Sequence, residues 1–484
     1  MEAASSTRRL DHPAVTNKVG WWPLVVIASA HLMAVLDTTV MFVALPSLQR
    51  GLGMSVTDRQ WVVTAYTVAL AGLLLPGGRL ADRLGARRTL LIGVAGFACA
   101  SAVGGASVDG IMVIVARTFQ GAFGAVLISS TKSLLVTVYS DEDERARVMG
   151  VFTATIASGG AVGLILGGLL TSELSWRWCL YVNVALSLVS LIGGPRVLPS
   201  LPRRKEVRID LQSTLLGMTG MGALVYGLGE ASSAGWRSGQ IIGSLVAAVV
   251  LLSAFVARQV GHPERLLPLR IVLDRSRGWA LIALIVNGLS TFGMMLILTY
   301  QLQSVLGYSA LRTGLALIPF AVGGVIGSAL LAPSLMVRIP PRWLISAGVV
   351  AEAAALLPLV WLTPRSGYLP LVFLATLLEG IGTGLAAPTS LNTALGEVLP
   401  SDRGAAGAVT SAASQLGSSI GAALLNTIAV AVATSYLATH PSLGVITSTV
   451  HGFAVAMVWG ALITAAAAIP IAIFVNARTP ARQP

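Results

Sequence analysis

The sequence predicts an all-α integral membrane protein that crosses the bilayer fourteen times. Of the 484 residues, 55% are hydrophobic and only 11% are charged, whereas a soluble globular chain carries about 25% charged residues. The apolar residues gather into stretches of roughly 20, long enough to cross a hydrocarbon core of about 30 Å as a helix. Lipid offers backbone amides no hydrogen-bond partners, so a spanning segment must be a helix or part of a closed β-barrel. These stretches do not alternate apolar and polar residues as barrel strands do, so helices are predicted.

Fourteen stretches fit this description. They are approximately residues 21–46, 58–78, 89–107, 110–137, 147–171, 177–198, 210–230, 239–258, 278–303, 311–335, 342–363, 368–391, 404–433 and 452–475. Long basic connections on either side of the seventh and eighth stretches divide the chain into six helices, two extra helices and six more. Paired six-helix halves are typical of transporters with a substrate site at the interface between two repeats.

The predicted domains follow from this division. They are an N-terminal tail (1–20), an N-terminal six-helix bundle (21–200), two extra central helices with basic loops (201–276), a C-terminal six-helix bundle (277–476) and a C-terminal tail (477–484). The first tail lacks the apolar core and cleavage site of a signal peptide. We expect both tails to be cytoplasmic.

The basic residues test the count and the orientation. With the N-terminus in the cytoplasm, the cytoplasmic segments hold 24 of the 32 Lys and Arg, the opposite segments hold 6, and the spans hold 2. This segregation obeys the positive-inside rule and favours fourteen crossings over twelve or thirteen. The net charge of +12 is therefore explained by loops near a membrane. The basic residues do not gather on one amphipathic face, so the sequence does not predict nucleic-acid binding.

Nothing in the sequence predicts an enzyme, a cofactor or a metal. No P-loop of the form GxxxxGK[ST] occurs, which excludes direct drive by ATP. Cys99 and Cys179 lie in separate apolar stretches, so we expect neither a disulfide nor a metal site.

A polar segment between the second and third predicted helices carries a family signature. Its residues are Gly78, Asp82, Arg83, Gly85, Arg87 and Arg88. The pattern resembles the loop motif of the major facilitator superfamily, whose fold is two six-helix bundles that expose a central site alternately to each side. In that family the Asp latches the halves on the cytoplasmic side. The resemblance implies that Asp82 meets the thirteenth helix, near Gly404.

The first predicted helix contains a carboxylate, Asp37. A charge at mid-membrane costs about 2.5–3.5 kcal/mol, so Asp37 should face a wet cavity or a partner. At 1.5 Å per residue, Asp37 lies about 14 Å from the outer end, and Arg117 of the fourth helix lies about 10 Å deep. We therefore expect these two side chains to share a level. Two interpretations remain open: a proton-coupling pair, or a static ion pair joining the helices.

Both helices resemble one branch of this superfamily, the fourteen-helix drug:proton antiporters. The segments that carry the resemblance are Leu36–Pro46 and Arg117–Gly121. Phe42 stands where that branch usually has Asn. The resemblance implies that Arg117 takes part in proton transfer. It also implies a substrate cavity lined by Asp37, Thr38, Gln120, Glu379 and Gln415.

The fifth predicted helix has glycines on one face. Gly159, Gly163 and Gly167 recur every four residues, a spacing that permits close contact with another helix. Together with Gly168 they resemble the antiporter motif, which family members use to seal the halves against proton leak. Leu164 stands where the motif usually has Pro.

Two more acids lie within predicted helices of the second half. Glu352 and Glu379 are each ten residues inside a span, or about 15 Å deep. Intramembrane acids are functional candidates by default, so both are proton-coupling candidates. Glu379 lies in a glycine-rich stretch and is favoured for binding a proton or cation. Glu352 lies on a helix that is usually peripheral, where a structural role is the stronger alternative.

The resemblance as a whole implies a proton-driven exporter of lipophilic drugs or antibiotics in the cytoplasmic membrane of a bacterium. Its partners would be protons, a small lipophilic substrate and the bilayer, and it would act as a monomer. A dedicated exporter of an endogenous metabolite, such as an antibiotic or siderophore, is the main alternative. An uptake symporter and a membrane sensor without transport are weaker ones.

Overall fold

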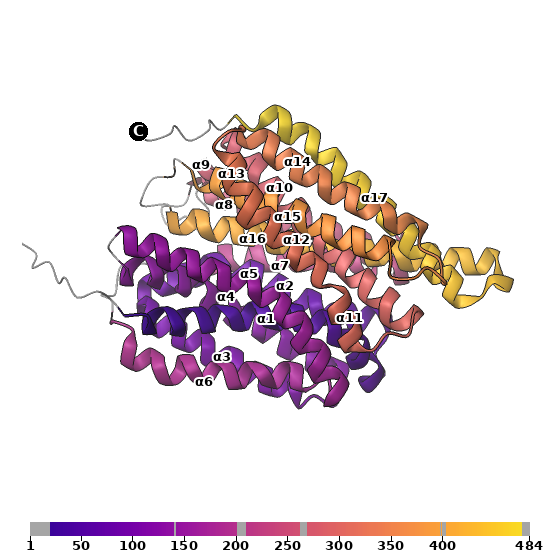
Figure 1. The fold of residues 1–484 in the computed structure, drawn as a ribbon, viewed down its shortest axis with the longest axis horizontal. Coiled ribbons are helices and arrows are strands. Elements are labelled where there is room, and N and C mark those ends of the chain that lie inside the picture. The colour runs from indigo at the N-terminus through magenta and orange to yellow at the C-terminus, as the bar shows by residue number, and fades with distance from the viewer. Residues whose placement is uncertain are drawn as a thin grey trace, which may run out of the picture.

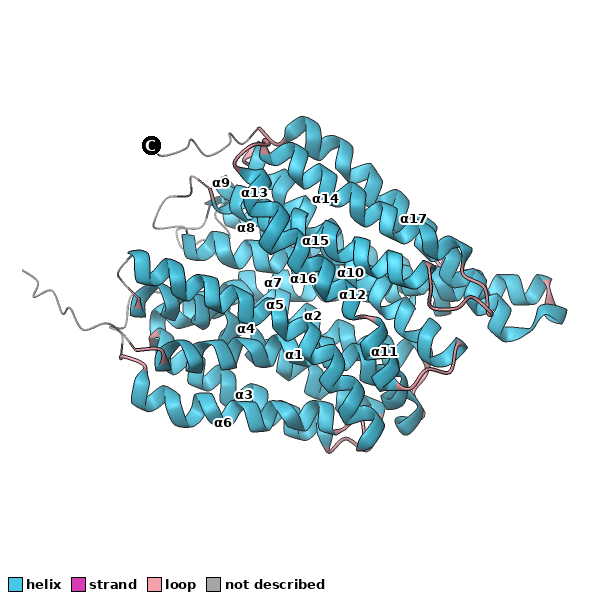
Figure 2. Cartoon of the chain, viewed as in Figure 1, coloured by secondary structure: helices cyan, strands magenta, loops and turns pink. Residues whose placement is uncertain are grey.

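The computed structural model describes residues 20–139, 142–200, 210–261, 269–396, 398 and 403–476. Within these ranges every regular element is a helix, as Figure 2 shows, so the all-α prediction is confirmed. The long helices are α1 (Trp22–Leu52), α2 (Val56–Leu84), α3 (Ala86–Gly105), α4 (Gly110–Val138), α5 (Glu142–Glu173), α6 (Trp178–Val197), α7 (Leu211–Ala234), α8 (Gly239–Gly261), α10 (Arg275–Tyr300), α14 (Pro341–Leu356), α15 (Leu371–Leu395), α16 (Arg403–Thr439) and α17 (Gly444–Phe474).

Shorter helices complete the second half of the chain. They are α9 (Leu269–Val272), α11 (Ala310–Ala316), α12 (Ile318–Val325) and α13 (Ala332–Met336). A π-helical turn, Gln301–Val305, extends α10, and a second one, Ile326–Leu331, joins α12 to α13. Residues 310–336 therefore form one continuous helical stretch, built of α11, α12, a π-helical turn and α13.

The helices are long and apolar enough for a multi-pass membrane protein. Among the described residues, eleven helical stretches have the length and hydropathy needed to cross a bilayer. Helices α2, α5 and α7 are not among the eleven, although they have 29, 32 and 24 residues. Gly, Ser and Thr in α7 lower its hydropathy. The count of fourteen crossings therefore stays a prediction.

Two groups of helices pack side by side, with a helical pair against their boundary (Figure 1). Helices α1–α6 pack with one another, mainly through α2 on α4, α3 on α4 and α1 on α5. Helices α10–α17 form the second group, and α2–α16 and α5–α11 contacts join the two groups. Helices α7 and α8 pack on each other, and α7 also packs on α2 and α16. The predicted boundary at residue 201 adjoins segment 201–209, which lies outside the described residues. The predicted boundary at residue 276 falls in the first turn of α10.

The start of α1 and the residues just after α17 lie at the same end of the helical bundle (Figure 1). The backbone N–H of Leu24, at the start of α1, donates to Tyr139 Oη at the end of α4 (3.1 Å). The N–H of Asn476, just after α17, donates to Ser276 Oγ at the start of α10 (2.9 Å). We call this end, which also holds Gly85, the motif end. The opposite end, with the α16–α17 corner, is the far end (right in Figure 1).

The polar segment between α2 and α3 is more helical than predicted. The sequence ends the second span at Gly78, but α2 continues past it, and Gly85 alone makes the turn into α3. Its φ of 89° is a conformation that only glycine adopts without strain. Arg87 then donates to the Pro195 carbonyl oxygen (2.6 Å) and to Ser200 Oγ (2.9 Å), which ties α3 to the end of α6.

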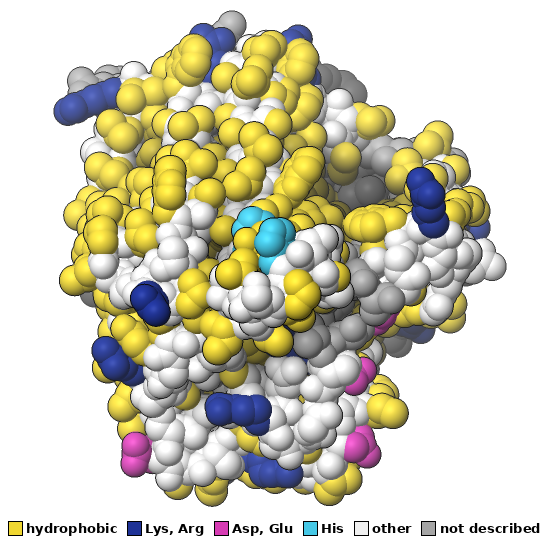
Figure 3. Space-filling view, turned by 90° about the vertical axis from the view of Figure 1, so that its right-hand side faces the viewer, with side chains coloured by type: hydrophobic (Ala, Val, Ile, Leu, Met, Phe, Trp, Pro, Cys, Tyr) yellow, Lys and Arg dark blue, Asp and Glu magenta, His cyan; other side chains and the backbone are white. Residues whose placement is uncertain are grey.

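Figure 3 looks onto the far end. Basic and acidic side chains are scattered across this face rather than gathered, among apolar and uncharged polar groups. At the α16–α17 corner, Tyr436 stacks on His440 and on His451, with ring centroids 4.5 and 4.1 Å apart.

Candidate functional site

Asp37 is enclosed by polar side chains from α4 and α6. Its side chain forms a salt bridge with the guanidinium of Arg117 through Oδ2. Oδ1 accepts hydrogen bonds from Asn183 Nδ2 (2.7 Å) and Gln120 Nε2 (3.2 Å). Asp37 is only 1% exposed, so its charge is balanced inside the bundle by Arg117 rather than by water. Two charge-assisted contacts and one ion pair make this a strongly held carboxylate.

Arg117 extends the network to α2. Its Nε donates to the carbonyl oxygen of Val62 (3.0 Å), and its guanidinium lies 4.2 Å from the centre of the Tyr66 ring. Gln120 accepts from Arg117 (2.9 Å) and donates to Ser101 Oγ on α3 (2.6 Å). The network thus draws on α1, α2, α3, α4 and α6. A buried charge pair is tolerated when further hydrogen bonds satisfy both partners, as they do here.

The structure brings together Asp37 and Arg117, which the depth argument placed at one level. It also places Asn183 against Asp37 and Tyr66 against Arg117. Sequence reasoning did not assign either residue to this site. An amide inside an apolar helix was the available signal for Asn183, because intramembrane polar groups need partners. Tyr66 gave no signal, since an aromatic residue within a membrane helix is ordinary.

The residues predicted to line a substrate cavity are mostly enclosed in this conformation. Asp37, Gln120 and Glu379 are each 1% exposed or less. Thr38 is partly buried, and its hydroxyl donates to the Ala34 carbonyl oxygen on its own helix. Gln415 is partly buried on α16. Within the described residues no hydrogen bond joins Gln415 to the Asp37 network, so their shared role stays a prediction.

The regularly spaced glycines of α5 face α1. A Cβ on Gly163 would overlap the hydroxyl of Thr39, and a Cβ on Gly167 would lie 2.8 Å from the Cα of Val40. Gly159 is equally close to a leucine side chain of α1. The two helices therefore touch along the stretch that holds Asp37, because small residues let backbones approach.

Gly168 faces the other helical group. A Cβ at this position would lie 2.6 Å from the Cα of Leu311 on α11. In return, Gly314 of α11 packs directly against the carbonyl oxygen of Leu164. Helices α5 and α11 thus meet backbone to backbone between the two groups, and this leaves no room for a water-filled path at that contact.

The polar segment of residues 78–88, which covers the end of α2 and the start of α3, is only partly described. Arg83 and Arg88 are exposed, Arg87 is bound to α6, and a Cβ on Gly78 would meet nothing within 4 Å. The side chain of Asp82 lies outside the described residues, as do the side chains near Gly404. The predicted latch between them stays a prediction.

Glu352 on α14 and Glu379 on α15 are both fully buried. Oε1 of Glu352 accepts from Asn287 Nδ2 (2.6 Å), and Oε1 of Glu379 accepts from Thr291 Oγ1 (3.0 Å). Both donors lie on α10, one turn apart. The hydroxyl of Thr383 lies 3.1 Å from each donor, and this joins the two carboxyl groups into one cluster.

This acid pair differs from the Asp37 site because the described residues supply it with no cation. Oε2 of Glu352 and Oε2 of Glu379 are both buried without a hydrogen-bond partner. Two unpaired carboxylates would each carry a desolvation cost of several kcal/mol. A protonated carboxyl group avoids that cost, so the geometry suits a group that holds a proton. Sequence reasoning placed Glu352 on a peripheral helix; the fold places it beside Glu379.

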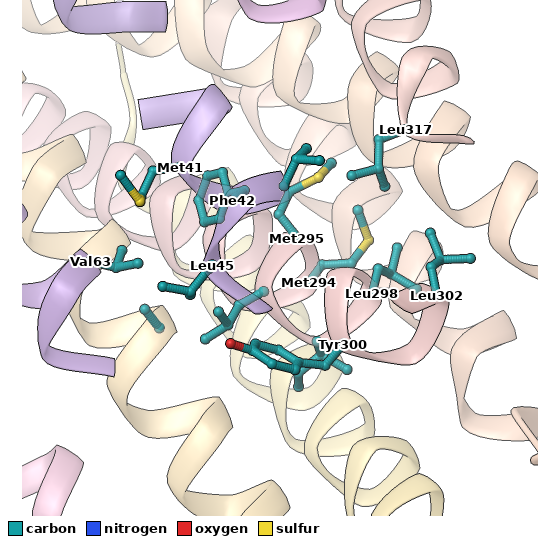
Figure 4. Packing of buried hydrophobic residues seen from close by; sticks show 14 of the residues in the cluster. Met41, Phe42, Leu45, Val63, Met294, Met295, Leu298, Tyr300, Leu302 and Leu317 are labelled. Carbon is teal, nitrogen blue, oxygen red and sulfur yellow. The ribbon is translucent and has the colours of Figure 1, made fainter. Parts of the chain in front are cut away.

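An apolar cluster closes the far end between the two groups. The cluster includes Met41, Phe42 and Leu45 of α1, Val63, Leu317, and Met294, Met295, Leu298, Tyr300 and Leu302 of α10 and its π-helical turn. Phe42 lies on the side of α1 nearer Met295, whereas Met41 lies on the side nearer Val63 (Figure 4). The ring of Phe42 meets that of Phe292 edge to face at 5.1 Å. The residue that replaces the family's usual Asn therefore packs across the interface between the groups.

Polar contacts join the groups next to this cluster. Arg59, at the start of α2, donates to Gln49 Oε1 (3.0 Å) and to Asn426 Oδ1 on α16 (3.3 Å). Its guanidinium also lies 3.5 Å from the centre of the Tyr300 ring. Asn426 in turn donates to Gln60 Oε1 (2.8 Å). Arg59 is thus a buried cation that bridges both helical groups.

We expect Arg59→Ala to open the far end. Hydrogen bonds to charged groups contribute about 1.5–3 kcal/mol, so their loss would shift the equilibrium between closed and open far ends by roughly ten- to hundredfold. Spin labels at the exposed positions 174 and 443, in a background without Cys99, would report longer distances. Arg50→Ala is the matched control, because Arg50 hydrogen-bonds only within α1 in the described contacts. Unchanged distances in Arg59→Ala would contradict the bridging role.

Comparison with known sequences agrees with these features. Residues 27–422 match the family described as Major Facilitator Superfamily. The chain is 42% identical to the puromycin resistance protein pur8 of Streptomyces alboniger, over 95% of this chain and 92% of that protein. It is 37% identical to the cephamycin export protein CmcT of Amycolatopsis lactamdurans, over 84% of each. It is 31% identical to a tetracenomycin C resistance and export protein of Streptomyces glaucescens, over 84% of this chain and 76% of that protein.

Solved structures share the fold. The POT family transporter PepTSo matches with a TM-score of 0.68 at 16% identity, over 94% of this chain and 99% of that one. An inward-facing bacterial homologue of the human lysosomal transporter Spinster matches with a TM-score of 0.65, also at 16% identity, over 94% and 96%. The paired helical groups, the signature after α2 and the sequence relatives lead to one conclusion: this chain belongs to the major facilitator superfamily of membrane transporters.

Proposed function

We propose that this protein is a proton-coupled antiporter that exports lipophilic drugs or antibiotics across the cytoplasmic membrane by alternating access. The observation that carries the proposal is a buried, fully paired Asp37 in a transporter whose relatives are named for resistance to, or export of, puromycin, cephamycin and tetracenomycin C. These antibiotics differ in chemistry. A dedicated exporter of one endogenous metabolite therefore fits less well.

Asp37 is the proposed proton-coupling residue, with Arg117 as its switchable partner. In the described conformation the guanidinium of Arg117 forms a salt bridge with the Asp37 carboxylate. A rearrangement that separates Asp37 from Arg117, while Arg117 keeps its contacts with Val62 and Tyr66, would leave Asp37 without its cation and favour proton uptake. The proton would then travel in the direction opposite to the substrate. The hydrogen bond from Arg117 to the Val62 carbonyl oxygen supports this role, because it would hold the guanidinium on α2 after the salt bridge breaks.

The acid pair Glu352–Glu379 is the proposed second proton site. It lies in the other helical group and holds its carboxyl groups without a described cation. Protons bound in both groups would be released or taken up when the groups reorient. This arrangement places a titratable site on each side of the interface at which the substrate is expected.

The motif end is proposed to face the cytoplasm, because the segments at that end hold most of the Lys and Arg. The far end is closed by the apolar cluster and by Arg59, and this supports an inward-facing conformation. Gly168 and Gly314 support a seal against proton leak at the same closed end. Fourteen crossings, two six-helix domains and a monomeric state complete the proposal.

Transport into inverted proteoliposomes tests the proposal. Purified protein, given an imposed pH gradient, should move ethidium, puromycin or other members of a small antibiotic panel, and a protonophore should abolish the movement. Gradient-driven transport of several unrelated compounds would support multidrug antiport. Transport of none of them would favour the dedicated metabolite exporter, and movement in the same direction as the protons would favour a symporter.

A further inference from the structure

A cavity of about 540 Å³ lies between the α7–α8 pair and the helices α2, α10 and α16. Its walls are mainly apolar and include Phe255 of α8, Trp279 of α10 and Met221 of α7. The first turns of α7 and α10 contribute to the lining, so the cavity lies toward the motif end. It is separate from the Asp37 network and from the acid pair, none of whose residues lines it.

Direct contacts hold the α7–α8 pair to the rest of the bundle at the other end. Toward the far end, Val225 is fully buried, Thr427 Oγ1 donates to the Leu228 carbonyl oxygen (2.8 Å), and Trp61 Nε1 donates to Glu230 Oε1 (3.3 Å). Toward the motif end, α7 still packs on α2, since a Cβ on Gly72 would lie 3.2 Å from the Cα of Met218. The cavity lies beside this contact, and Gly72 is part of its lining.

Polar groups at the motif end of this pair are already committed to one another. Arg258 of α8 forms a salt bridge with Asp210 (3.1 Å), and Ser213 donates to the same carboxylate (2.5 Å). Burial opposes ionisation of Asp210, but the hydrogen bonds from Ser213 and the contacts with Arg258 outweigh it and lower its pKa to about 2. The ion pair between Asp210 and Arg258 therefore stays ionised at physiological pH. Ser213, which lines the cavity, already makes hydrogen bonds with Asp210 and Gln259.

The charged residues of the lining are Asp274 and Arg275. Asp274 caps α10 and accepts from the backbone N–H of Arg277 (2.9 Å). The guanidinium of Arg275 lies 4.6 Å from the centre of the Phe474 ring. Asp274 and Arg275 are both exposed, so their charges lie at the solvated edge of the cavity. A charged ligand would have to leave water for walls that are otherwise mainly apolar, which is unfavourable. The lining therefore suits an uncharged molecule with apolar or aromatic surface.

We propose that this cavity is a reception site for uncharged lipophilic small molecules that enter from the bilayer. Its volume lies within the range of about 300–1,000 Å³ that is typical of small-molecule pockets. Only 11% of the membrane-spanning stretch of α8 is buried, and Val246, Val249 and Val250 are exposed on it. One layer of helices thus separates the cavity from lipid. A phospholipid is disfavoured, because its phosphate would need a basic pocket, and the single basic residue of the lining, Arg275, stands beside the acidic Asp274.

The walls of the cavity explain how binding there would serve transport. Helix α2 belongs to one helical group, and α10 and α16 belong to the other, so closing the motif end would change the shape of the cavity. A ligand that fits only the open motif end favours that conformation by its difference in affinity. The two extra helices would then form the outer wall of a loading site. The claim that the bound molecule is transported rests on the proposed antiport function.

Photolabelling with the uncharged probe phenyl-trifluoromethyl-diazirine tests the proposal. The full-length protein in phosphatidylcholine nanodiscs would be labelled and its peptides mapped by mass spectrometry. Gly217 lines the cavity, and a Cβ there would make only an ordinary contact with Phe255 (3.5 Å), so Gly217→Leu fills the cavity without forcing the helices apart. Ala412→Phe fills it from the α16 side. Gly243→Leu is the matched control, because its Cβ would meet nothing within 4 Å.

We expect labelling on the cavity-lining peptides of α7 and α10 that falls roughly tenfold in both filled variants and persists in the control. Equal labelling in all variants would overturn the proposal. So would a phospholipid that native mass spectrometry finds bound to the wild type and lost from Gly217→Leu. Labelling that behaves as expected in a protein without gradient-driven transport would uphold the binding site and refute the transport function instead.

Discussion

Asp37→Asn is expected to abolish proton-driven export while substrate binding persists. The variant cannot change its charge at this position, so an imposed pH gradient would no longer bias the exchange between conformations. Coupling between two sites is typically worth 1–3 kcal/mol, so gradient-driven flux should fall by up to about 100-fold. Substrate counterflow without a gradient should continue, because it needs no proton. Both fluxes would be measured in the same proteoliposomes.

Stability must be separated from coupling in this experiment, because Asp37→Asn leaves Arg117 buried without its counter-charge. Breaking a buried ion pair costs about 3–5 kcal/mol. The double variant Asp37→Asn/Arg117→Gln removes both charges and should recover thermal stability without recovering gradient-driven flux. Asp58→Asn, an exposed carboxylate in the capping box of α2, is the matched control. Gradient-driven flux that survives in Asp37→Asn would move the coupling site to the acid pair.

The double variant Glu352→Gln/Glu379→Gln is expected to reduce the number of protons moved per substrate. A glutamine has the shape of a protonated glutamate and can still accept from Asn287 and Thr291. The protein should therefore remain folded. Each proton that moves down one pH unit contributes about 1.4 kcal/mol, so the loss of one coupled proton lowers the substrate gradient at equilibrium about tenfold. That gradient would be measured in proteoliposomes at a fixed pH difference.

Single variants and a surface control identify the source of any loss. Glu352→Gln and Glu379→Gln should each reproduce much of the effect, because the two carboxyl groups share one hydrogen-bonded cluster. Glu173→Gln, at the exposed end of α5, should leave the substrate gradient unchanged. If the double variant sustains the wild-type gradient, the acid pair is a structural element of α10, α14 and α15 and the second proton site is refuted.

Local sequence determined the helical class of this protein. Apolar stretches as long as a bilayer is thick allow few structures other than helices, and the glycine spacing on α5 predicts a close helix contact wherever its partner lies. Depth arguments also placed Asp37 and Arg117 correctly at one level. Such arguments succeed because the bilayer imposes a common axis, so position along the chain becomes position in space.

Only the tertiary structure decided which side chains meet across helices. Asn183 joins Asp37 from 146 positions away, Glu352 lies beside Glu379 although their helices are separate spans, and Phe42 packs on Phe292 between the groups. The cavity beside α7 and α8 likewise exists only because residues of α2, α7, α8, α10 and α16, far apart in the sequence, come together around it. Rotation of each helix about its own axis, and the choice of its neighbours, depend on the packing of the whole bundle. No single stretch of sequence contains that information.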